Sequence, residues 1–341
     1  MKLDPRNILV IDFGQLGDVV LSLPALRAIR ERFPISRITV AVGLPTVPIV
    51  ELSGYADVTL GVDRVELRDG PKFRSIMNIA RLVKEVRLRR FDFVIDLHSL
   101  SETNLLGYLS GAQMRLFGHR SGRSINFLSN FSPKPPFEDA GKHAVDRYLD
   151  VLAPLGIENV QRVPQLNPRD GDTRTIHEIL KKENAAYSPL VGLFPGSGQH
   201  TSKRWPLERF SDLAERLVRD DGVRIVLFAG PEEVDLVEKM RAAFPPSTVI
   251  FDHLNIPQLA AALAELTCFV SNSTGPMHIA AAVGTPVVML LPRLTPDSFT
   301  PIGEGHHIIF SRSLEELEVS EVYEVTRRVV SSERLCSTPA S

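Results

Sequence analysis

Apolar residues along the chain form short runs that alternate with longer stretches of helical spacing. The runs at 8–11, 38–42 and 91–97 are almost wholly apolar, as expected for strands buried on both faces of a parallel sheet. Between 19 and 33, apolar side chains recur every three or four residues with arginines between them, which predicts an amphipathic helix. A strand, a glycine-bearing turn and a helix in this order are typical of a doubly wound α/β domain.

The second half of the chain repeats this alternation. Its strands are predicted at 190–194, 224–228, 248–251, 267–271 and 286–291, and its helices at 207–219, 232–243, 256–265, 276–283 and 313–330. Further helices of the first half are predicted at 73–89, 103–109 and 143–155. We therefore expect two Rossmann-like domains, 1–165 and 166–312, facing each other across a cleft with ligands at the carboxyl ends of the strands. A segment at 164–172, with Pro, Asn and Gly, is predicted to link them. The tail 331–341 is predicted to be disordered.

Length and composition agree with two globular domains. The chain has 341 residues, 43% hydrophobic and 23% charged, with 25 prolines. The net charge of −2 gives no reason to expect nucleic-acid binding. Residues 1–168 nevertheless carry 22 Lys and Arg against 18 Asp and Glu, with a basic cluster at 87–90. Two interpretations of that cluster stay open, a solvated helix face and a surface for an anionic acceptor or membrane.

The cysteines and the amino terminus narrow the class of protein. Only Cys268 and Cys336 are present, so we expect no disulfide framework. No His, Cys, Asp and Glu cluster has metal-ligand spacing, so we expect no tightly held metal or other cofactor. The first residues carry charges where a signal peptide needs an apolar run, and no stretch reaches the roughly 20 apolar residues of a spanning helix. We therefore expect a cytoplasmic protein.

The first of three candidate loops at predicted strand ends is 14–18, GQLGD. Its glycines permit a tight turn and the close approach of a ligand. Asp18 stands where a helix begins, and it is either an N-terminal cap or a carboxylate that acts as general base. The G-x-G-x-x-G spacing of a dinucleotide site is absent.

The second candidate loop is 195–206, PGSGQHTSKRWP. Ser197 and Gly198 offer backbone donors on a flexible chain, and Lys203 offers positive charge. Lys203 is either a surface lysine before a helix or a phosphate ligand. The spacing is not that of a P-loop. Trp205, the only tryptophan, is expected to anchor the loop to the core.

The third candidate loop is 271–285, SNSTGPMHIAAAVGT, which joins a strand to a short apolar helix. Ser273 and Thr274 offer side-chain oxygens as helix caps, and Pro276 suits the first turn. The backbone N–H groups and the positive end of the helix dipole would form an anion site. We expect a structural role for His278 in preference to a catalytic one, because no nucleophile elbow accompanies it.

Five segments together resemble glycosyltransferase family 9, the ADP-heptose:lipopolysaccharide heptosyltransferases and their relatives. They are 12–24 (DFGQLGDVVLSLP), 91–99 (FDFVIDLHS), 143–156 (HAVDRYLDVLAPLG), 194–206 and 271–286. Each motif is weak alone, but their order and spacing over nearly the whole chain are specific. The resemblance implies a GT-B fold, with the acceptor on the N-terminal domain and the nucleotide sugar on the C-terminal domain. It also implies that the helix 313–330 packs back toward the N-terminal domain.

The resemblance further implies an inverting, metal-independent transfer of a sugar, expected to be heptose from ADP-heptose. The acceptor would be a lipid-linked anionic core oligosaccharide, with peripheral contact at the inner face of the inner membrane. The base would be Asp18, and Lys203 with the 274–275 loop would stabilise the leaving diphosphate. Further donor contacts are expected at Ser197, Gly198, Glu232 or Glu233 (ribose), Leu254 (near adenine), Ser273, Thr274, Gly275, Pro276, Met277 and His278, and acceptor contacts at Gly17, Arg120 and Arg123.

Two departures from the family pattern leave alternatives open. Ser273 stands where many relatives have an acidic residue, and Asp12 stands where relatives often have Arg or Lys. A serine can bind a phosphate or cap a helix, but it carries no charge. The alternatives to a heptosyltransferase are a related enzyme that uses another nucleotide sugar for a different envelope glycan, and a catalytically inert sugar-nucleotide-binding protein.

Overall fold

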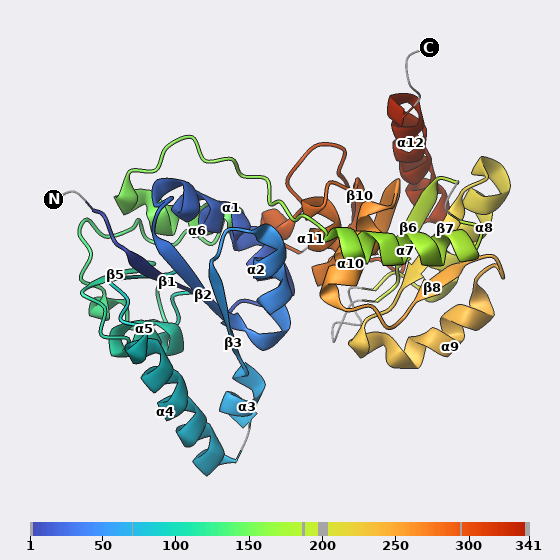
Figure 1. The fold of residues 1–341 in the computed structure, drawn as a ribbon. Helices are drawn as coiled ribbons and strands as arrows, with labels where there is room; N and C mark the ends of the chain where they lie inside the picture. Colours follow the sequence, from blue (N-terminus) through green and yellow to red (C-terminus); the bar gives the residue numbers. More distant parts are fainter. Residues whose placement is uncertain (1–2, 70, 186–187, 197–203, 294, 338–341) are drawn as a thin grey trace. The chain divides into compact units, whose positions relative to one another are not determined.

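The computed structural model describes residues 3–69, 71–185, 188–196, 204–293 and 295–337. The chain divides into two compact units, 1–164 and 165–341. Each unit contains one sheet whose neighbouring strands are all parallel and which is accompanied by helices (Figure 1). The predicted class, two Rossmann-like α/β domains, is confirmed.

The first unit contains a five-stranded sheet in the order β3-β2-β1-β4-β5. The strands are β1 (Asn7–Asp12), β2 (Arg37–Gly43), β3 (Val58–Val62), β4 (Phe93–Asp96) and β5 (Met114–Phe117). The chain order reverses between β1 and β4, where Ile11 lies opposite Asp96. Loops that follow strands on either side of such a reversal open at the carboxyl edge of the sheet, which is where ligands bind in doubly wound folds.

The helices of the first unit cover this sheet. They are α1 (Leu16–Arg32), α2 (Val47–Ser53), α3 (Arg64–Asp69), α4 (Lys72–Leu88), α5 (Ser101–Leu109) and α6 (Ala144–Leu152), with 3₁₀ turns η1 (Leu44–Thr46), η2 (Asn126–Leu128) and η3 (Ala153–Leu155). A buried cluster that includes Leu9, Ile11, Val94 and Phe117 forms a core beneath α4 and α5. The pattern analysis missed β3, β5, α2 and α3, because these elements are short.

The second unit contains a six-stranded sheet in the order β11-β10-β9-β6-β7-β8. The strands are β6 (Leu190–Phe194), β7 (Arg224–Phe228), β8 (Val249–Phe251), β9 (Cys268–Asn272), β10 (Val287–Pro292) and β11 (His307–Ser311). Here the chain order reverses between β6 and β9, so the loops after these two strands meet at the carboxyl edge. They are the second and third candidate loops.

The helices of the second unit are α7 (Asp170–Lys182), α8 (Leu207–Asp221), α9 (Val234–Ala243), α10 (Ile256–Ala264), α11 (Gly275–Ala282) and α12 (Val319–Ser337), with 3₁₀ turns η5 (Pro231–Glu233) and η6 (Asp297–Phe299). Trp205 is completely buried; its indole Nε1 donates to the Leu317 carbonyl at 2.9 Å, and its ring lies 4.7 Å from Phe210. In the part of the chain that the structure describes, no helix is long and apolar enough to cross a bilayer.

Two predictions of element bounds were wrong. The predicted linker 164–172 overlaps the start of α7 at Asp170. The last helix spans Val319–Ser337 instead of 313–330, so the predicted disordered tail begins too early. Neither Pro nor Gly occurs between 319 and 337, so no residue there breaks the helix at 330. Ser313 to Leu317 form turns before the helix begins. The buried Val322 and Tyr323 belong to the core of the second unit.

Candidate active site

The loop after β1 places two carboxylates at the point where strand order reverses in the first sheet. Asp12 is the last residue of β1, and Asp18 lies in the first turn of α1. The Gln15 N–H donates to Asp18 Oδ2 at 2.9 Å, which is a capping contact at the helix start. A Cβ on Gly14 would lie 2.5 Å from the Asp18 Cβ, so the turn can approach Asp18 only with glycine at this position.

His98, in the loop after β4, lies beside Asp12. The His98 Nδ1 is 3.7 Å from Asp12 Oδ1, and the same oxygen accepts the Gly14 N–H at 3.0 Å. Burial by itself would raise the pKa of Asp12, but His98, Ser22 and the Gly14 N–H outweigh it, so the pKa lies below its ordinary value. Asp12, only 2% exposed, is therefore a buried negative charge at neutral pH. The sequence analysis noted Asp12 only as a departure from the family pattern, and it did not identify His98 as a candidate site residue.

The surroundings of Asp18 raise its basicity. Burial is the largest influence and raises the pKa of Asp18, and the negative charge of Asp12 acts in the same direction. The Gln15 N–H and the charges of His98 and Arg147 oppose the rise without cancelling it. A raised pKa suits a carboxylate that must accept a proton near neutral pH. The N-terminal cap of α1 is Gln15 and Asp18 is the third helical residue, so the expectation that Asp18 is itself the cap is corrected. Its contact with the Gln15 N–H uses Oδ2, and a role as base stays a prediction.

Tyr148, on α6, faces the same two carboxylates. Its pKa lies well above the ordinary value, first because of burial and then because of the negative charges of Asp12 and Asp18. The phenol is therefore a neutral hydrogen-bonding group at physiological pH. The switch point of the first sheet thus joins a pair of carboxylates from β1 and α1, an imidazole from the loop after β4 and a phenol from α6.

In the second unit, one buried amide at the end of β9 holds the loop after β6. Asn272 Nδ2 donates to the carbonyls of Pro195 and Gly196 at 3.2 and 3.0 Å, and its Oδ1 accepts the Trp205 N–H at 3.0 Å. These partners define the amide orientation, because carbonyls only accept and an N–H only donates. Asn272 thereby ties both ends of the second candidate loop to β9. Ser197, Gly198 and Lys203 lie between those ends and outside the described residues.

The third candidate loop begins α11 in a different way from the prediction. The N-terminal cap is Thr274, but its side chain makes no capping hydrogen bond; its hydroxyl oxygen lies 3.1 Å from Ser271 Oγ. Ser273 precedes the cap, so the expected capping role of both side chains is corrected. Residues 273–276 are half-buried at the carboxyl edge, whereas Met277 and His278 are buried.

The loop after β7 carries two adjacent glutamates with different surroundings. Glu233 is buried, and its Oε2 accepts the Gly230 N–H at 3.1 Å. A Cβ on Gly196 would lie 2.4 Å from Glu233 Oε1, so this carboxylate packs directly against the loop after β6. Glu232 is exposed. Leu254, after β8, is half-buried at the same edge of the sheet.

Comparison with known proteins identifies the family. The model of glycosyltransferase family 9 (heptosyltransferase) matches residues 79–324, which is more than half of the chain. The chain belongs to glycosyltransferase family 9. It is therefore a glycosyltransferase, and the expected family is confirmed.

Curated relatives of this family 9 enzyme include two proteins of Escherichia coli K12. Lipopolysaccharide heptosyltransferase 3 is 26% identical over 281 residues, covering 80% of this chain and 79% of the relative. Lipopolysaccharide heptosyltransferase 2 is 24% identical over 321 residues, covering 89% and 87%.

Solved structures share the fold. The family 9 glycosyltransferase of Veillonella parvula has a TM-score of 0.85 at 22% identity and covers 97% of this chain and 99% of its own. ADP-heptose lipopolysaccharide heptosyltransferase II of E. coli has a TM-score of 0.78 at 22% identity, with 96% and 99% covered. These likenesses confirm the expected GT-B fold class.

Within the family 9 enzyme, Arg120 is held by the protein itself. Its Nε and Nη2 donate to Glu138 at 2.6 and 2.8 Å, and its Nη1 donates to the His98 carbonyl at 2.8 Å. Arg120 therefore fixes the loop at 118–140 beside the Asp12–His98 pair. Arg123 is exposed, and Gly17 is half-buried in the first turn of α1.

Asp96, at the end of β4, is a further carboxylate with a raised pKa. It is completely buried, and it accepts the Ser99 N–H and an Asn104 Nδ2–H, each at 2.7 Å. Burial outweighs these bonds and raises the pKa of Asp96 to about 6.

The raised pKa of Asp96 predicts a pH dependence of stability. Because the folded-state pKa exceeds the unfolded value, this group stabilises the fold fully below about pH 4, and its contribution is lost as the pH rises through about 6. Relative to Asp96→Asn, the free energy of unfolding of the wild type should fall by about 3 kcal/mol between pH 4 and pH 7. Urea unfolding of both proteins across this range measures the difference; a difference that does not change with pH would contradict the prediction.

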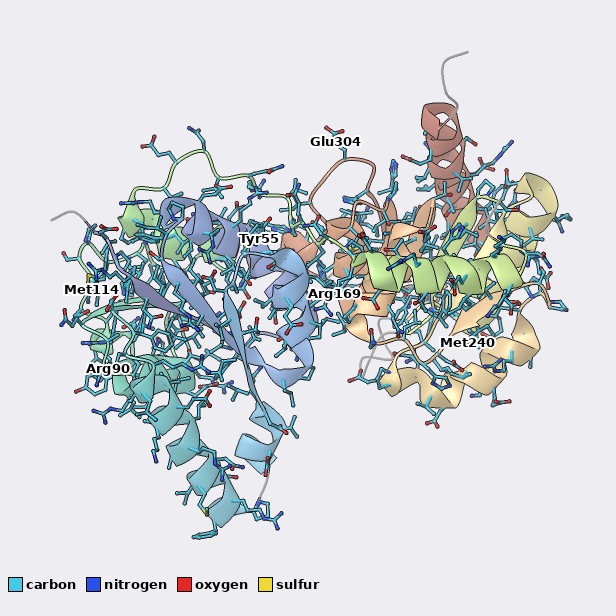
Figure 2. The ribbon with its side chains drawn as sticks, viewed as in Figure 1. Tyr55, Arg90, Met114, Arg169, Met240 and Glu304 are labelled. Carbon is cyan, nitrogen blue, oxygen red and sulfur yellow. The ribbon has the colours of Figure 1, made fainter. Side chains whose placement is uncertain are left out.

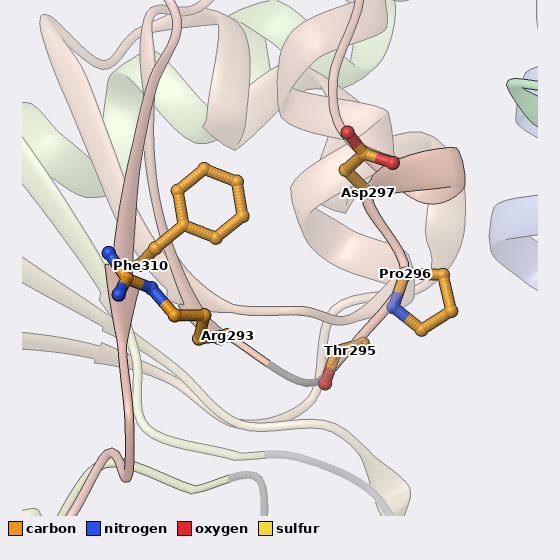
Figure 3. Close-up of a pocket in the computed structure, with 5 residues that line it drawn as sticks. All are labelled: Arg293, Thr295, Pro296, Asp297 and Phe310. Atoms are coloured by element: carbon orange, nitrogen blue, oxygen red, sulfur yellow. The ribbon is translucent and has the colours of Figure 1, made fainter.

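An open hollow lies at the carboxyl end of β10 beside β11 (Figure 3). Its lining residues are Arg293, Thr295, Pro296, Asp297 and Phe310. In the close-up, Arg293 and Phe310 lie on one side and the segment 295–297 on the other. Because β10 neighbours β9, the hollow shares the carboxyl edge with the candidate loops. Among the residues placed by the structure, no group of three or more His, Cys, Asp and Glu is arranged to hold a metal ion.

Proposed function

We propose that this enzyme transfers heptose from ADP-heptose to a lipopolysaccharide core acceptor, with inversion at the anomeric carbon and without a metal. The observation that carries the proposal is Asp18, a half-buried carboxylate of raised pKa at the switch point of the first sheet. The relatives named as lipopolysaccharide heptosyltransferases support it. A further structure of this fold is E. coli heptosyltransferase WaaC with ADP-2-deoxy-2-fluoro heptose, at 20% identity and a TM-score of 0.74.

In the proposed reaction, an acceptor hydroxyl gives its proton to Asp18. The hydroxyl oxygen attacks the anomeric carbon from the face opposite the diphosphate, so one C–O bond forms while the bond to the leaving ADP breaks. A well-placed base contributes about 10²–10⁴ in rate. Domain 1–165 would hold the acceptor with Gly17, Arg120 and Arg123, and domain 166–312 would hold the nucleotide sugar. Because Arg120 already binds Glu138 and the His98 carbonyl, we expect it to shape the acceptor loop.

The leaving diphosphate would be stabilised at the switch point of the second sheet. Lys203 would supply the charge, and the N–H groups at the start of α11, from Thr274 onward, would supply hydrogen bonds. A helix terminus stabilises a nearby negative charge by about 0.3–2 kcal/mol. Lys203 should therefore stabilise the leaving diphosphate more than the start of α11 does. Ser273 brings no negative charge next to the phosphates. We expect the remaining contacts of the donor at Ser197, Gly198, Leu254, and Glu232 or Glu233.

A donor screen tests the proposal. Thermal shift with ADP-, UDP-, GDP- and CMP-linked sugars should show selective stabilisation by ADP-heptose, and ADP release should require both donor and acceptor. Stabilisation by a different nucleotide sugar would favour the related enzyme of another envelope glycan. Binding without release for any acceptor would favour the inert binding protein. Glu232→Gln and Glu233→Gln, compared by ADP affinity, would assign the ribose contact.

The proposed acceptor is lipid-linked, so the enzyme would work as a peripheral protein at the inner face of the inner membrane. The excess of Lys and Arg over Asp and Glu in residues 1–168 supports this location, because the inner leaflet carries anionic lipids.

A further inference from the structure

Exposed large apolar side chains are concentrated on one helix, α4. Of the fourteen exposed large apolar side chains among the described residues, five lie on it, namely Phe73, Ile76, Met77, Ile79 and Leu88. Phe73, Ile76 and Met77 are three and four residues apart, so they lie side by side on the helix surface. Phe73 is 74% exposed and Ile76 is 65% exposed. Leaving such a cluster in water is unfavourable, at roughly 1.5–3 kcal/mol for each fully exposed side chain.

One side of α4 packs on the protein toward the carboxyl-terminal end of the helix. Val86 is completely buried, and Leu82 and Val83 pack against the core of the first unit. The Ser75 hydroxyl donates to the Glu66 carbonyl at 3.0 Å and links α4 to α3. Ile76 and Ile79 lie seven and four residues before Val83, so they continue the packed side of α4 toward its amino-terminal end. Phe73 and Met77 lie on the side away from Leu82 and Val86 and belong to the exposed side of the helix. Figure 1 shows α4 extending away from the sheet, with its amino-terminal end next to α3.

The exposed side of α4 continues into a strongly basic surface. Met77, Arg81, Lys84 and Arg87 follow one another at spacings of three and four residues, so the apolar turns and the basic turns share a side of the helix. The three basic side chains are exposed. Two further arginines follow the helix, and Arg90 is labelled in Figure 2. Glu85 is the sole acidic residue from 72 to 90, and its carboxylate pairs with Arg89 at 2.7 Å.

We propose, resting on the lipid-linked acceptor of the proposed function, that this surface docks on an anionic phospholipid bilayer. The α4 face is defined by Phe73, Ile76, Met77, Arg81, Lys84 and Arg87. Its apolar side chains enter the boundary between headgroups and acyl chains, and its basic side chains meet the lipid phosphates. A second copy of this chain is a poor occupant, because it would bring two surfaces of the same charge together.

Vesicle flotation with the full chain tests this docking. The protein should float with vesicles that contain about one-third phosphatidylglycerol and stay unbound with phosphatidylcholine alone. Raising the salt from about 0.1 M to about 1 M should weaken binding, because the screening length falls from about 10 Å to about 3 Å. Arg81→Gln/Lys84→Gln/Arg87→Gln should lower affinity about a hundredfold, since each charge contributes about fivefold. Phe73→Ser should lower it at least about tenfold.

Matched variants control for general effects of charge and exposure. Arg174→Gln/Lys181→Gln/Lys182→Gln removes three exposed charges from α7, and Phe127→Ser removes an equally exposed phenylalanine from η2. Both should bind vesicles as the wild type does. Equal losses in the control and α4 variants, binding that ignores lipid charge, or no flotation at all would overturn the proposal. Self-association that disappears in Phe73→Ser would overturn it in favour of a second copy.

Turnover on a deacylated, soluble acceptor separates this docking from the proposed function. The α4 variants should retain that turnover and the wild-type melting temperature, because the changed side chains are exposed. A chain that floats with anionic vesicles but releases no ADP would contradict the proposed function alone. A chain that turns over the soluble acceptor but does not float would contradict the docking alone.

Discussion

Asp18→Asn is expected to lower turnover by about 10²–10⁴-fold while the affinity for ADP stays unchanged. The amide keeps the size of the side chain and can still accept the Gln15 N–H, so α1 should begin as in the wild type. It cannot accept the proton of the acceptor hydroxyl. Single-turnover kinetics and ADP calorimetry on the same preparation measure the two quantities. Full activity of this variant would exclude Asp18 as the base.

The pH profile gives Asp18 a second signature. If Asp18 is the base, kcat/KM should fall at low pH as its carboxylate is protonated, with a midpoint above the ordinary aspartate value because the pKa is raised. Asp12→Asn removes a buried negative charge that raises this pKa, so the midpoint should move to lower pH. Asp57→Asn, which removes a carboxylate held by Arg30 and the Ile38 N–H, should leave the midpoint unchanged. A midpoint that does not respond to Asp12→Asn would assign the acid limb to another group.

Asn272→Ala should have the largest effect on the second unit. It removes the partners of three backbone groups, the carbonyls of Pro195 and Gly196 and the N–H of Trp205. Because a buried polar group without a partner costs about 1–3 kcal/mol, we expect the free energy of unfolding to fall by about 2–5 kcal/mol. The ends of the second candidate loop would no longer be held to β9, so ADP affinity should fall as well. Urea unfolding and calorimetry measure the two effects.

Asn272→Asp keeps this prediction testable if the alanine variant does not fold. The aspartate retains an acceptor for the Trp205 N–H but loses both donors to the loop carbonyls. It also adds a negative charge beside the proposed phosphate site. The free energy of ADP binding should therefore weaken by more than the free energy of unfolding falls. Ser211→Ala is the control: it removes the hydrogen bond from α8 to the Ala243 carbonyl, costs about 1 kcal/mol and should leave ADP affinity unchanged. Unchanged ADP affinity in both Asn272 variants would show that the amide has only a structural role.

The sequence predictions were most accurate where an apolar run was long and contained few polar residues. The bounds of β6 and β7 were predicted correctly, because each is a mainly apolar run that ends just before a turn with proline and glycine. β5 was missed because it has four residues, one of them Arg115, and is only half-buried over its first two positions. Asp18 was singled out because a glycine turn and a helix start surround it in the sequence.

The sequence by itself determined the α/β alternation, the two Rossmann-like units, the family, and the position of the three loops at strand ends. These features depend on local spacing and on contiguous motifs, which a single chain displays directly. Only the tertiary structure decided which loops meet. Asp12 meets His98, and Asn272 meets Pro195 seventy-seven residues away, because strand order reverses between β1 and β4 and between β9 and β6. Strand order depends on how whole layers pack, and no local pattern specifies it.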